Sequence, residues 1–552
     1  MGASRLDALR QRIDRADGMA LLCGALGAAA VLAALLEAPS GVTAAICLLT
    51  VAIVVWRALA GSRSSAPVGR DVVPRVLVAV AIAIAASDRL GAAGGVVLAL
   101  AVVAEVSVQS VSQGAFPLGV RVPGGDVVRR RPLPTSSTFF VNTAALVIAV
   151  GMARILPVVI LLLAVIALLL EVGMVGVDLA FIGRRRRAES TLTAALGEYS
   201  PEFVVHWDAP AGTAFQLSMW LPHLDRLGHR YVVLVRDEQS FTEVTDLTDR
   251  PMLLRRTLAD LDRVIVPSIR AAFYVNNSMR NAHFVRYVGI RHVMLGHGDS
   301  EKTPFYNPAS RMYDRFFVAG QAAVDRFASH GVPTAPDFFE IVGRPQVEGI
   351  QVGSPGAEVK AVLYAPTWAG HNADSDYSSL PIGPGIVQAL LDRGRIVVFR
   401  AHPYSEQTPA LRRQAAEIRR MLAADAQSTG RPHIFGAAAE TERSLIDCFN
   451  ASDAMIADVS SLVSDFLQSE KPFAVTAMDR ETAALEKSSA LYAAGLTIAG
   501  DGSNIAQVVD HLLADDAGRA QRQAIKAYYL GEPAAGEGHF AAAVGRILTT
   551  SG

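Results

Sequence analysis

Apolar stretches fill the first third of the chain, and they limit what it can fold into. A helix needs about 20 apolar residues to cross the hydrocarbon core of a bilayer. Ala, Val, Leu, Ile and Gly dominate residues 1–183, whereas the rest of the 552 residues has the mixed charge of a soluble protein. We therefore predict an α-helical membrane domain over residues 1–183. About six spans are expected, with four or five as alternatives: Met19–Leu36, Val42–Ala60, Val73–Ala86, Gly91–Val111, Phe139–Ala153 and Ile155–Phe181.

The arginines predict the orientation of these spans. They cluster before the first span and after the second, fourth and sixth, whereas the other connections carry almost none. Because positive charge stays on the cytoplasmic side, six spans place every cluster and the rest of the chain in the cytoplasm. Five spans would leave the Arg184–Arg187 run outside. The acidic residues Glu105, Glu171 and Asp178 lie near predicted span ends, which favours anchoring over ion conduction.

Overall charge and cysteine content exclude some functions. The net charge is −1 and the pI is about 6.9, so no general basic field points to nucleic acid. Cys23, Cys47 and Cys448 have neither metal-binding spacing nor the pattern of a disulfide framework. We expect all three to be packing residues.

After a linker over residues 184–200, with a short helix at Ala188–Tyr199, the chain alternates short apolar strands with helical patterns. This alternation predicts parallel sheets, in one lobe over residues 201–350 and a second over 358–552, separated by a Gly- and Pro-containing break. The last stretch, Ala517–Ile547, is expected to be helical and could return to the first lobe. The predicted strands are Phe203–His206, Tyr231–Val235, Arg263–Pro267, Ala272–Val275, Val293–Leu295, Phe316–Gly320, Glu340–Gly343, Ala361–Ala365, Ile396–Arg400, Ala454–Ala457 and Pro472–Val475.

One predicted strand of the first lobe ends in Gly296-His297-Gly298. The glycines allow a sharp turn, so His297 would stand at the carboxyl edge of the sheet, where ligands of α/β proteins bind. Imidazole is a suitable general base because its ordinary pKa lies near neutral pH. Lys302 would lie one turn into a following helix, within reach of a phosphate. A plain strand-to-helix turn with a solvated His explains the same letters.

In the second lobe, three predicted strands also end in residues suited to phosphate chemistry. Thr367 follows the first strand, and Arg400 and His402 follow the second, two residues apart. Asp458-Val-Ser-Ser461 follows the third, just before a helix whose start can bind an anion. Ser460 can equally be a simple helix cap. Four such strand ends in one two-lobed chain favour a common site.

These motifs resemble the CDP-glycerol glycerophosphotransferase family, which includes teichoic-acid polymerases and primases. The family's Trp-His-Gly-Thr-Pro-Leu-Lys motif keeps His297, Gly298 and Lys302 here. The resemblance runs in family order from about Ala272 to Val475 and does not cover the membrane part. Further matches are Tyr364–Thr367, His402-Pro403, Asp458-Val-Ser-Ser461, Ser464-Asp465-Phe466, Lys471-Pro472, Tyr274–Ser278 and Val342–Pro345.

The resemblance implies a GT-B-like fold, two doubly wound sheets with a cleft between them, in a protein of the bacterial cell membrane. It implies transfer of a polyol phosphate from a CDP-alditol donor to a hydroxyl of a lipid-linked acceptor, with release of CMP. No cofactor is required, although the donor can carry a loosely held Mg²⁺. The residues implied are His297 and His402 for catalysis, Arg400, Thr367, Ser460, Ser461, Asp458 and Asp465 on the donor side, and Gly298 and Lys302 on the acceptor side.

Two departures and two alternatives stay open. Asp299-Ser300-Glu301 replaces Thr-Pro-Leu, which leaves the acceptor's identity open and predicts a raised pKa for His297 if the carboxylates lie close to it. Val459 replaces a Tyr. The alternatives are a glycosyltransferase of the same fold that uses a nucleotide sugar, and a membrane-anchored binding protein without activity.

Overall fold

The structure is a computed structural model that forms two compact units. One unit comprises Met1–Gly119 and Asp126–Thr191, and the other comprises Val120–Gly125 and Leu192–Gly552. The residues described are 18–60, 71–86, 88–114, 120–123, 136–152, 156–299, 301, 303–354, 358–369, 376–479, 481–514, 516–532 and 537–549.

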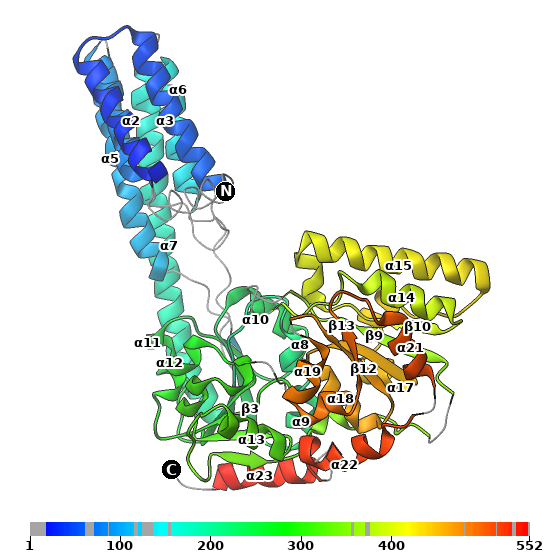
Figure 1. Cartoon of the computed structure of the whole chain (residues 1–552). Helices are drawn as coiled ribbons and strands as arrows, with labels where there is room; N and C mark the ends of the chain where they lie inside the picture. The colour runs from blue at the N-terminus through cyan, green and yellow to red at the C-terminus, as the bar shows by residue number, and fades with distance from the viewer. Residues whose placement is uncertain are drawn as a thin grey trace. The chain divides into compact units, whose positions relative to one another are not determined.

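The first unit is a bundle of apolar helices (Figure 1). Three of its helices are long and apolar enough to cross a membrane, and three more are apolar but shorter. Small residues let neighbouring helices approach, because a Cβ on Gly94 would lie 2.7 Å from the Leu161 backbone and one on Gly95 2.7 Å from Ala83. In chain order the helices are α2 (Gly18–Leu35), α3 (Ser40–Ala60), α4 (Val72–Ala85), α5 (Arg89–Gly114), α6 (Ser136–Met152) and α7 (Pro157–Tyr199).

A polar network lies among these apolar helices. Arg75 of α4 makes a bidentate ion pair with Glu105 of α5, at 2.7 Å for each contact, and both side chains are completely buried. Asn142 of α6 donates to Glu105 at 2.7 Å and to Glu171 of α7 at 2.6 Å. Arg75 did not figure among the charges expected inside the spans. The network joins four helices through charged and amide groups that have little access to water.

Helix α7 is longer than the sequence suggested. It runs without a break for 43 residues, from Pro157 to Tyr199, where we expected a span ending near Phe181 and a separate short helix. The arginine run is part of this helix, and Arg185 pairs with Glu189 one turn later at 2.9 Å. Good helix formers continue through the charged segment, so nothing in it interrupts the backbone hydrogen bonds. From Leu192 onward the helix belongs to the second unit.

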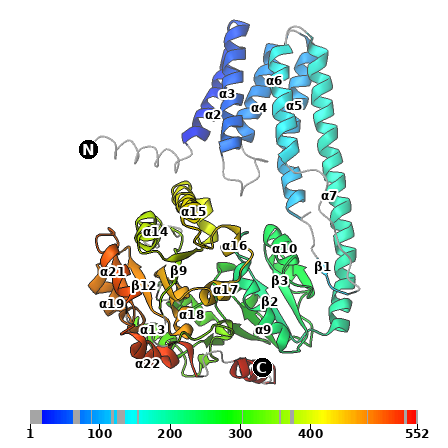
Figure 2. The same ribbon diagram turned by 90° about the vertical axis from the view of Figure 1, so that its right-hand side faces the viewer.

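The first lobe of the second unit is built on an eight-stranded sheet with the order β1-β4-β3-β2-β5-β6-β7-β8. All neighbours are parallel except β1, which is antiparallel to β4 (Figure 2). The strands are β1 (Val120–Arg121), β2 (Phe203–Trp207), β3 (Tyr231–Val235), β4 (Met252–Leu254), β5 (Ala271–Tyr274), β6 (Arg291–Met294), β7 (Arg315–Val318) and β8 (Phe339–Ile341). Its helices are α8 (Phe215–Ser218), α9 (Leu221–Arg226), α10 (Glu238–Thr245), α11 (Leu258–Leu261), α12 (Ala282–Val285) and α13 (Gln321–Ser329).

The second lobe is built on a five-stranded parallel sheet with the order β10-β9-β11-β12-β13. Its strands are β9 (Ala361–Ala365), β10 (Ile396–Phe399), β11 (Ala454–Asp458), β12 (Phe473–Ala477) and β13 (Leu496–Ala499). Its helices are α14 (Gly383–Asp392), α15 (Pro409–Thr429), α16 (Ala437–Glu440), α17 (Leu445–Asn450), α18 (Ser461–Phe466), α19 (Thr482–Ser488), α20 (Ala490–Ala493), α21 (Ile505–Leu513) and α22 (Arg519–Leu530).

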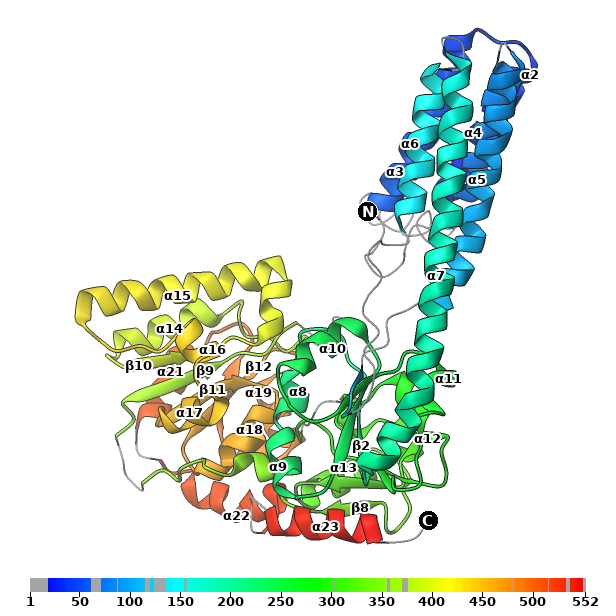
Figure 3. The same cartoon turned by 180° about the vertical axis from the view of Figure 1, so that it is seen from behind.

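The last helix, α23 (Glu537–Thr549), returns to the first lobe, as the sequence suggested. Phe540, Val544 and Leu548 are buried in the same core as Phe203 and Phe273 of the first sheet, and Figure 3 shows α23 beside that lobe. The chain therefore closes on the lobe with which its α/β part began.

The predicted fold class, a helical N-terminal part followed by two parallel-sheet lobes of GT-B type, is confirmed. Most predicted strands are present within one or two residues. The predicted strand Arg263–Pro267 is wrong, because residues 262–270 form turns and irregular backbone. Strands β1, β4 and β13 were not predicted. Pro267 cannot donate to a ladder, which explains why an apolar run there does not become a strand.

Candidate active site

The loop after β6 presents His297 at the carboxyl edge of the first sheet. Gly296 has a φ of 66°, a turn conformation that glycine adopts without strain, and its carbonyl accepts a 2.6 Å hydrogen bond from Nε1 of Trp220. The ring of Trp220 packs on Phe540 of α23, with centroids 5.3 Å apart. The buried indole of Trp220 therefore fixes the His297 loop through the Gly296 carbonyl.

The imidazole of His297 is suited to act as a base. Its ring donates to the Val275 carbonyl at the end of β5, and the side chain is exposed. The surrounding protein, helped by the positive charge of Arg344, lowers the pKa of His297, although the hydrogen bond to Val275 and the contact of the side chain with solvent oppose this shift. Because this pKa lies below neutral pH, the neutral imidazole dominates in the physiological range. The neutral imidazole is the form that can accept a proton.

The acidic neighbours do not raise that pKa, contrary to the expectation from the sequence. Asp299 and Glu301 both accept hydrogen bonds from Arg326 of α13, with contacts of 2.6 and 2.9 Å to Glu301. The guanidinium neutralises the two carboxylates locally. The replacement of Thr-Pro-Leu by these acids thus builds an ion-pair cluster beside the His297 turn, and the imidazole keeps its lowered pKa.

The His297 loop meets the second lobe at the start of α18. A Cβ placed on Gly298 would lie 2.7 Å from the side chain of Ser461, so glycine is required for this close approach. Oγ of Ser464 donates to the Asp299 carbonyl at 3.3 Å. The predicted acceptor-side turn and the predicted phosphate loop are therefore in contact.

A buried ion pair reinforces the same junction. Arg344, which follows β8, donates to both carboxylate oxygens of Asp465 in α18, at 2.9 and 3.1 Å. The two side chains are 5% and 8% exposed. Asp465 is thus engaged by Arg344 and supports the loop. We had noted the Val342–Pro345 segment as a family motif without giving Arg344 a role.

The start of α18 has the geometry of a cap without the cap hydrogen bond. Ser460 is extended, with φ −160° and ψ 166°, and its side chain accepts no bond from the helix. Among the described residues, its Oγ is buried without a hydrogen-bond partner. A hydroxyl of this kind is available to a ligand at the mouth of the helix.

Asp458 lies beneath this loop and is used internally. One carboxylate oxygen accepts from the backbone N–H groups of Thr367 at 2.6 Å and Ser379 at 3.1 Å, and the other accepts from Oγ1 of Thr476 at 2.6 Å. Burial raises its pKa. In this structure the hydrogen bonds of Asp458 join the carboxyl ends of β9, β11 and β12. Asp458 and the backbone of Thr367 thus hold the loops after these strands in place.

His402 stands at the end of β10 in an aromatic setting. Its Nδ1 accepts the backbone N–H of Tyr404 at 3.1 Å, so in the neutral ring Nε2 carries the proton. Its ring lies 6.1 Å from that of Trp368 and 6.0 Å from that of Phe215, which belongs to the first lobe. His402 thus also lies where the lobes meet.

Arg400 is oriented differently from our expectation. Its Nη1 donates to the carbonyls of Ala439 and Arg443, the latter at 3.0 Å. The guanidinium therefore stabilises the α16–α17 segment of its own lobe, and sequence spacing alone could not reveal this.

Lys302 lies outside the described residues. Among the residues described, no three His, Cys, Asp or Glu side chains form a group that could hold a metal ion.

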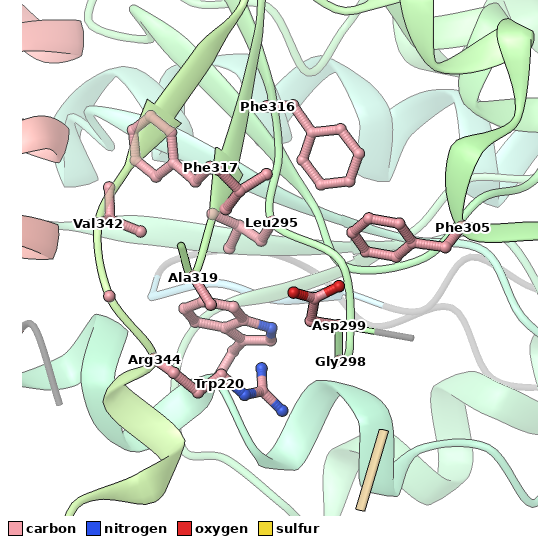
Figure 4. A pocket seen from close by; sticks show the side chains of 12 residues that line it. Trp220, Leu295, Gly298, Asp299, Phe305, Phe316, Phe317, Ala319, Val342 and Arg344 are labelled. Atoms are coloured by element: carbon pink, nitrogen blue, oxygen red, sulfur yellow. The ribbon is translucent and has the colours of Figure 1, made fainter. Parts of the chain in front are cut away.

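A small pocket of about 320 Å³ opens next to the His297 loop (Figure 4). Its walls are mainly apolar, with Trp220, Phe316 and Phe317 among them, and Asp299 and Arg344 supply the charged groups. No pattern in the sequence indicated Trp220 or Arg326, because both act through contacts between distant segments.

Comparison with known proteins finds a matching family model for the second lobe. Residues 342–488 match the model of the CDP-Glycerol:Poly(glycerophosphate) glycerophosphotransferase family. No curated protein matches the chain. A structure of the wall teichoic acid polymerase TagF is similar at 12% identity, covering 66% of this chain and 94% of that one, with a TM-score of 0.42. Acinetobacter baumannii MurG is similar at 10% identity, covering 63% and 100%, with a TM-score of 0.41. The family model confirms the resemblance first seen in the motifs over residues 342–488, which make up much of the second lobe: this part of the chain is similar to the CDP-glycerol glycerophosphotransferases, and the protein is a CDP-glycerol glycerophosphotransferase-like enzyme.

Proposed function

We propose that this enzyme is anchored in the bacterial cell membrane and transfers a polyol phosphate, glycerol phosphate or a close relative, to a hydroxyl of a lipid-linked acceptor. The product would extend a teichoic-acid-like wall polymer. The observation that carries the proposal is His297. Its imidazole has a lowered pKa and stands on a first-lobe loop that touches the start of α18 in the second lobe.

In the reaction that we propose, His297 removes the proton of the acceptor hydroxyl. The oxygen then attacks the donor phosphorus that bears the polyol, a new O–P bond forms, and the O–P bond to CMP breaks. The negative charge that develops on the phosphates needs donors already in place. We assign this role to His402, whose Nε2 carries the proton in the neutral ring because Nδ1 accepts a hydrogen bond from the Tyr404 N–H.

The start of α18 is the proposed cradle for the donor's diphosphate. The unpartnered Oγ of Ser460 and the backbone N–H groups that follow it would bind the phosphate oxygens. Asp465 would act through Arg344, which it holds beside the His297 loop. Arg400, Thr367 and Asp458 would support these groups from behind, as their internal hydrogen bonds suggest.

The membrane part fits a lipid-linked acceptor. The six apolar helices match the six predicted spans in order, and three of them are long enough to cross alone. Arginine clusters on alternate connections favour a cytoplasmic α/β part. In this orientation a donor from the cytoplasm and a lipid-linked acceptor would meet at that face of the membrane.

Release of CMP by the purified full-length protein tests this function. The protein in detergent is supplied with CDP-glycerol, CDP-ribitol or a UDP-sugar, with and without a lipid-linked acceptor. We expect acceptor-dependent CMP release from a CDP-alditol. UDP release from the sugar nucleotide would instead identify a glycosyltransferase, and failure to release any nucleotide would favour a binding protein.

A further inference from the structure

A short strand from the membrane part is built into the sheet of the first lobe. β1 lies in sequence between α5 and α6, yet it pairs with β4, with Val120 opposite Leu253 and Arg121 opposite Met252. The two strands are more than 130 residues apart in the chain. The α/β unit therefore includes residues from the α5–α6 connection as well as those that follow α7.

Side-chain contacts show that this pairing is more than a chance approach. The guanidinium of Arg121 donates to the carbonyls of Thr245 at 3.0 Å and Arg250 at 2.9 and 3.3 Å, and also to that of Thr248. These carbonyls belong to the last residue of α10 and to the segment between α10 and β4, so one arginine binds both ends of the connection. Val122, the next residue, is 6% exposed.

Helix α6 is also an integral part of the bundle, although it has only 17 residues. Its Asn142 is completely buried and donates to Glu105 of α5 and to Glu171 of α7. A helix that bonds to two long candidate spans through one buried amide must lie at the same depth as they do. This is how spanning helices pair through polar groups.

We propose that α6 and α7 cross the membrane together as a hairpin, and that β1 locks this topology. β1 and β4 can pair only when both lie on the same side of the membrane. The chain between them contains α6 and α7, so the number of crossings there must be even. If α7 crosses, which its length and composition favour, α6 must cross as well despite its shorter length. This inference concerns topology and goes beyond the transfer reaction.

Labelling of single introduced cysteines tests the hairpin in the full-length protein in cells. The native cysteines are buried, so they give a low background. Leu156→Cys lies between α6 and α7, whereas Pro123→Cys follows β1 and Ser503→Cys lies in the second lobe; all three positions are exposed. With a membrane-impermeant thiol reagent we expect labelling of Leu156→Cys in intact cells, and of the other two only after lysis. Equal labelling of Leu156→Cys and Pro123→Cys would overturn the hairpin.

A disulfide cross-link tests the strand pairing separately. Directly opposite residues of antiparallel strands have Cα atoms about 4.5–5.5 Å apart, which a disulfide can bridge. We expect Val120→Cys with Leu253→Cys to form an intramolecular disulfide on mild oxidation, detected by peptide mass spectrometry. Val120→Cys with Ile341→Cys, on the opposite edge of the sheet, should not. A cross-linked dimer or no cross-link in the first variant would overturn the pairing. Neither measurement depends on transferase activity.

Discussion

The ion pair between Arg344 and Asp465 offers the sharpest test of how the two lobes are joined. Asp465→Leu removes the carboxylate and leaves the Arg344 guanidinium, 5% exposed, without its two hydrogen bonds at 2.9 and 3.1 Å. Removing one partner of a buried pair typically costs about 3–5 kcal/mol, because the other charge stays buried and uncompensated. At roughly 2–4 °C per kcal/mol, the melting temperature should fall by at least about 6 °C.

The chain supplies a matched control. Arg393 and Asp510 form a bidentate pair of the same type, at 2.6 and 3.0 Å, but their side chains are 24% and 62% exposed. Exposed pairs contribute about 0–1 kcal/mol, so Asp510→Leu should shift the melting temperature by no more than about 4 °C. The double variant Arg344→Met/Asp465→Leu should recover most of the loss, since it leaves no unpaired charge.

Thermal unfolding of the full-length protein in detergent, followed by tryptophan fluorescence, gives these shifts. The same variants can be assayed for CMP release against pH. Because Arg344 lowers the pKa of His297, Arg344→Met should raise that pKa and move the rising limb of kcat/KM to higher pH. If Asp465→Leu and Asp510→Leu lowered the melting temperature by the same small amount, the argument that the buried Arg344–Asp465 pair stabilises the junction would be refuted.

Three further outcomes are expected at the same junction. His297→Ala should lower turnover by about 10²–10⁴-fold with donor affinity unchanged, measured by CMP release and by isothermal titration with a CDP-alditol; near-normal turnover would transfer the base role to His402. Gly298→Ala places a Cβ 2.7 Å from Ser461 and should reduce activity although the change is small, and a full-activity variant would show that the loop moves freely. Ser461→Pro removes an N–H at the helix start and should weaken donor binding far more than Ser460→Ala, whereas equal affinities would indicate a purely structural cap.

Patterns local in sequence predicted the fold well. Alternating apolar strands and helices indicated both lobes, and the motif around His297 indicated a turn at the carboxyl edge of a sheet. β4 escaped notice because it has only three residues, and its partner β1 comes from a distant connection. A pattern in the sequence indicates a strand only when it extends over four or more residues. A shorter strand, which exists because it pairs with its neighbours in the sheet, cannot be detected in this way.

Prediction of the site was limited by side-chain direction. Spacing suggested that Arg400 faces a phosphate, but its guanidinium donates to the carbonyls of Ala439 and Arg443. The acids beside His297 looked like neighbours that would raise its pKa, but Arg326, from a helix 25 residues later, binds them. Sequence shows which residues follow a strand, and tertiary packing decides what those residues contact.

The buried pair of Arg75 and Glu105 constrains how the membrane part is made. Helix α4 has only 14 residues, fewer than the about 20 needed to cross a bilayer alone, and it carries the charge of Arg75 in its first turn. α4 alone is therefore a poor candidate for stepwise release from the insertion machinery into lipid. Neutralised by Glu105 of the next helix, it becomes acceptable. We expect α4 to wait beside the translocon until α5 has been synthesised, so that the two helices enter the bilayer as one unit.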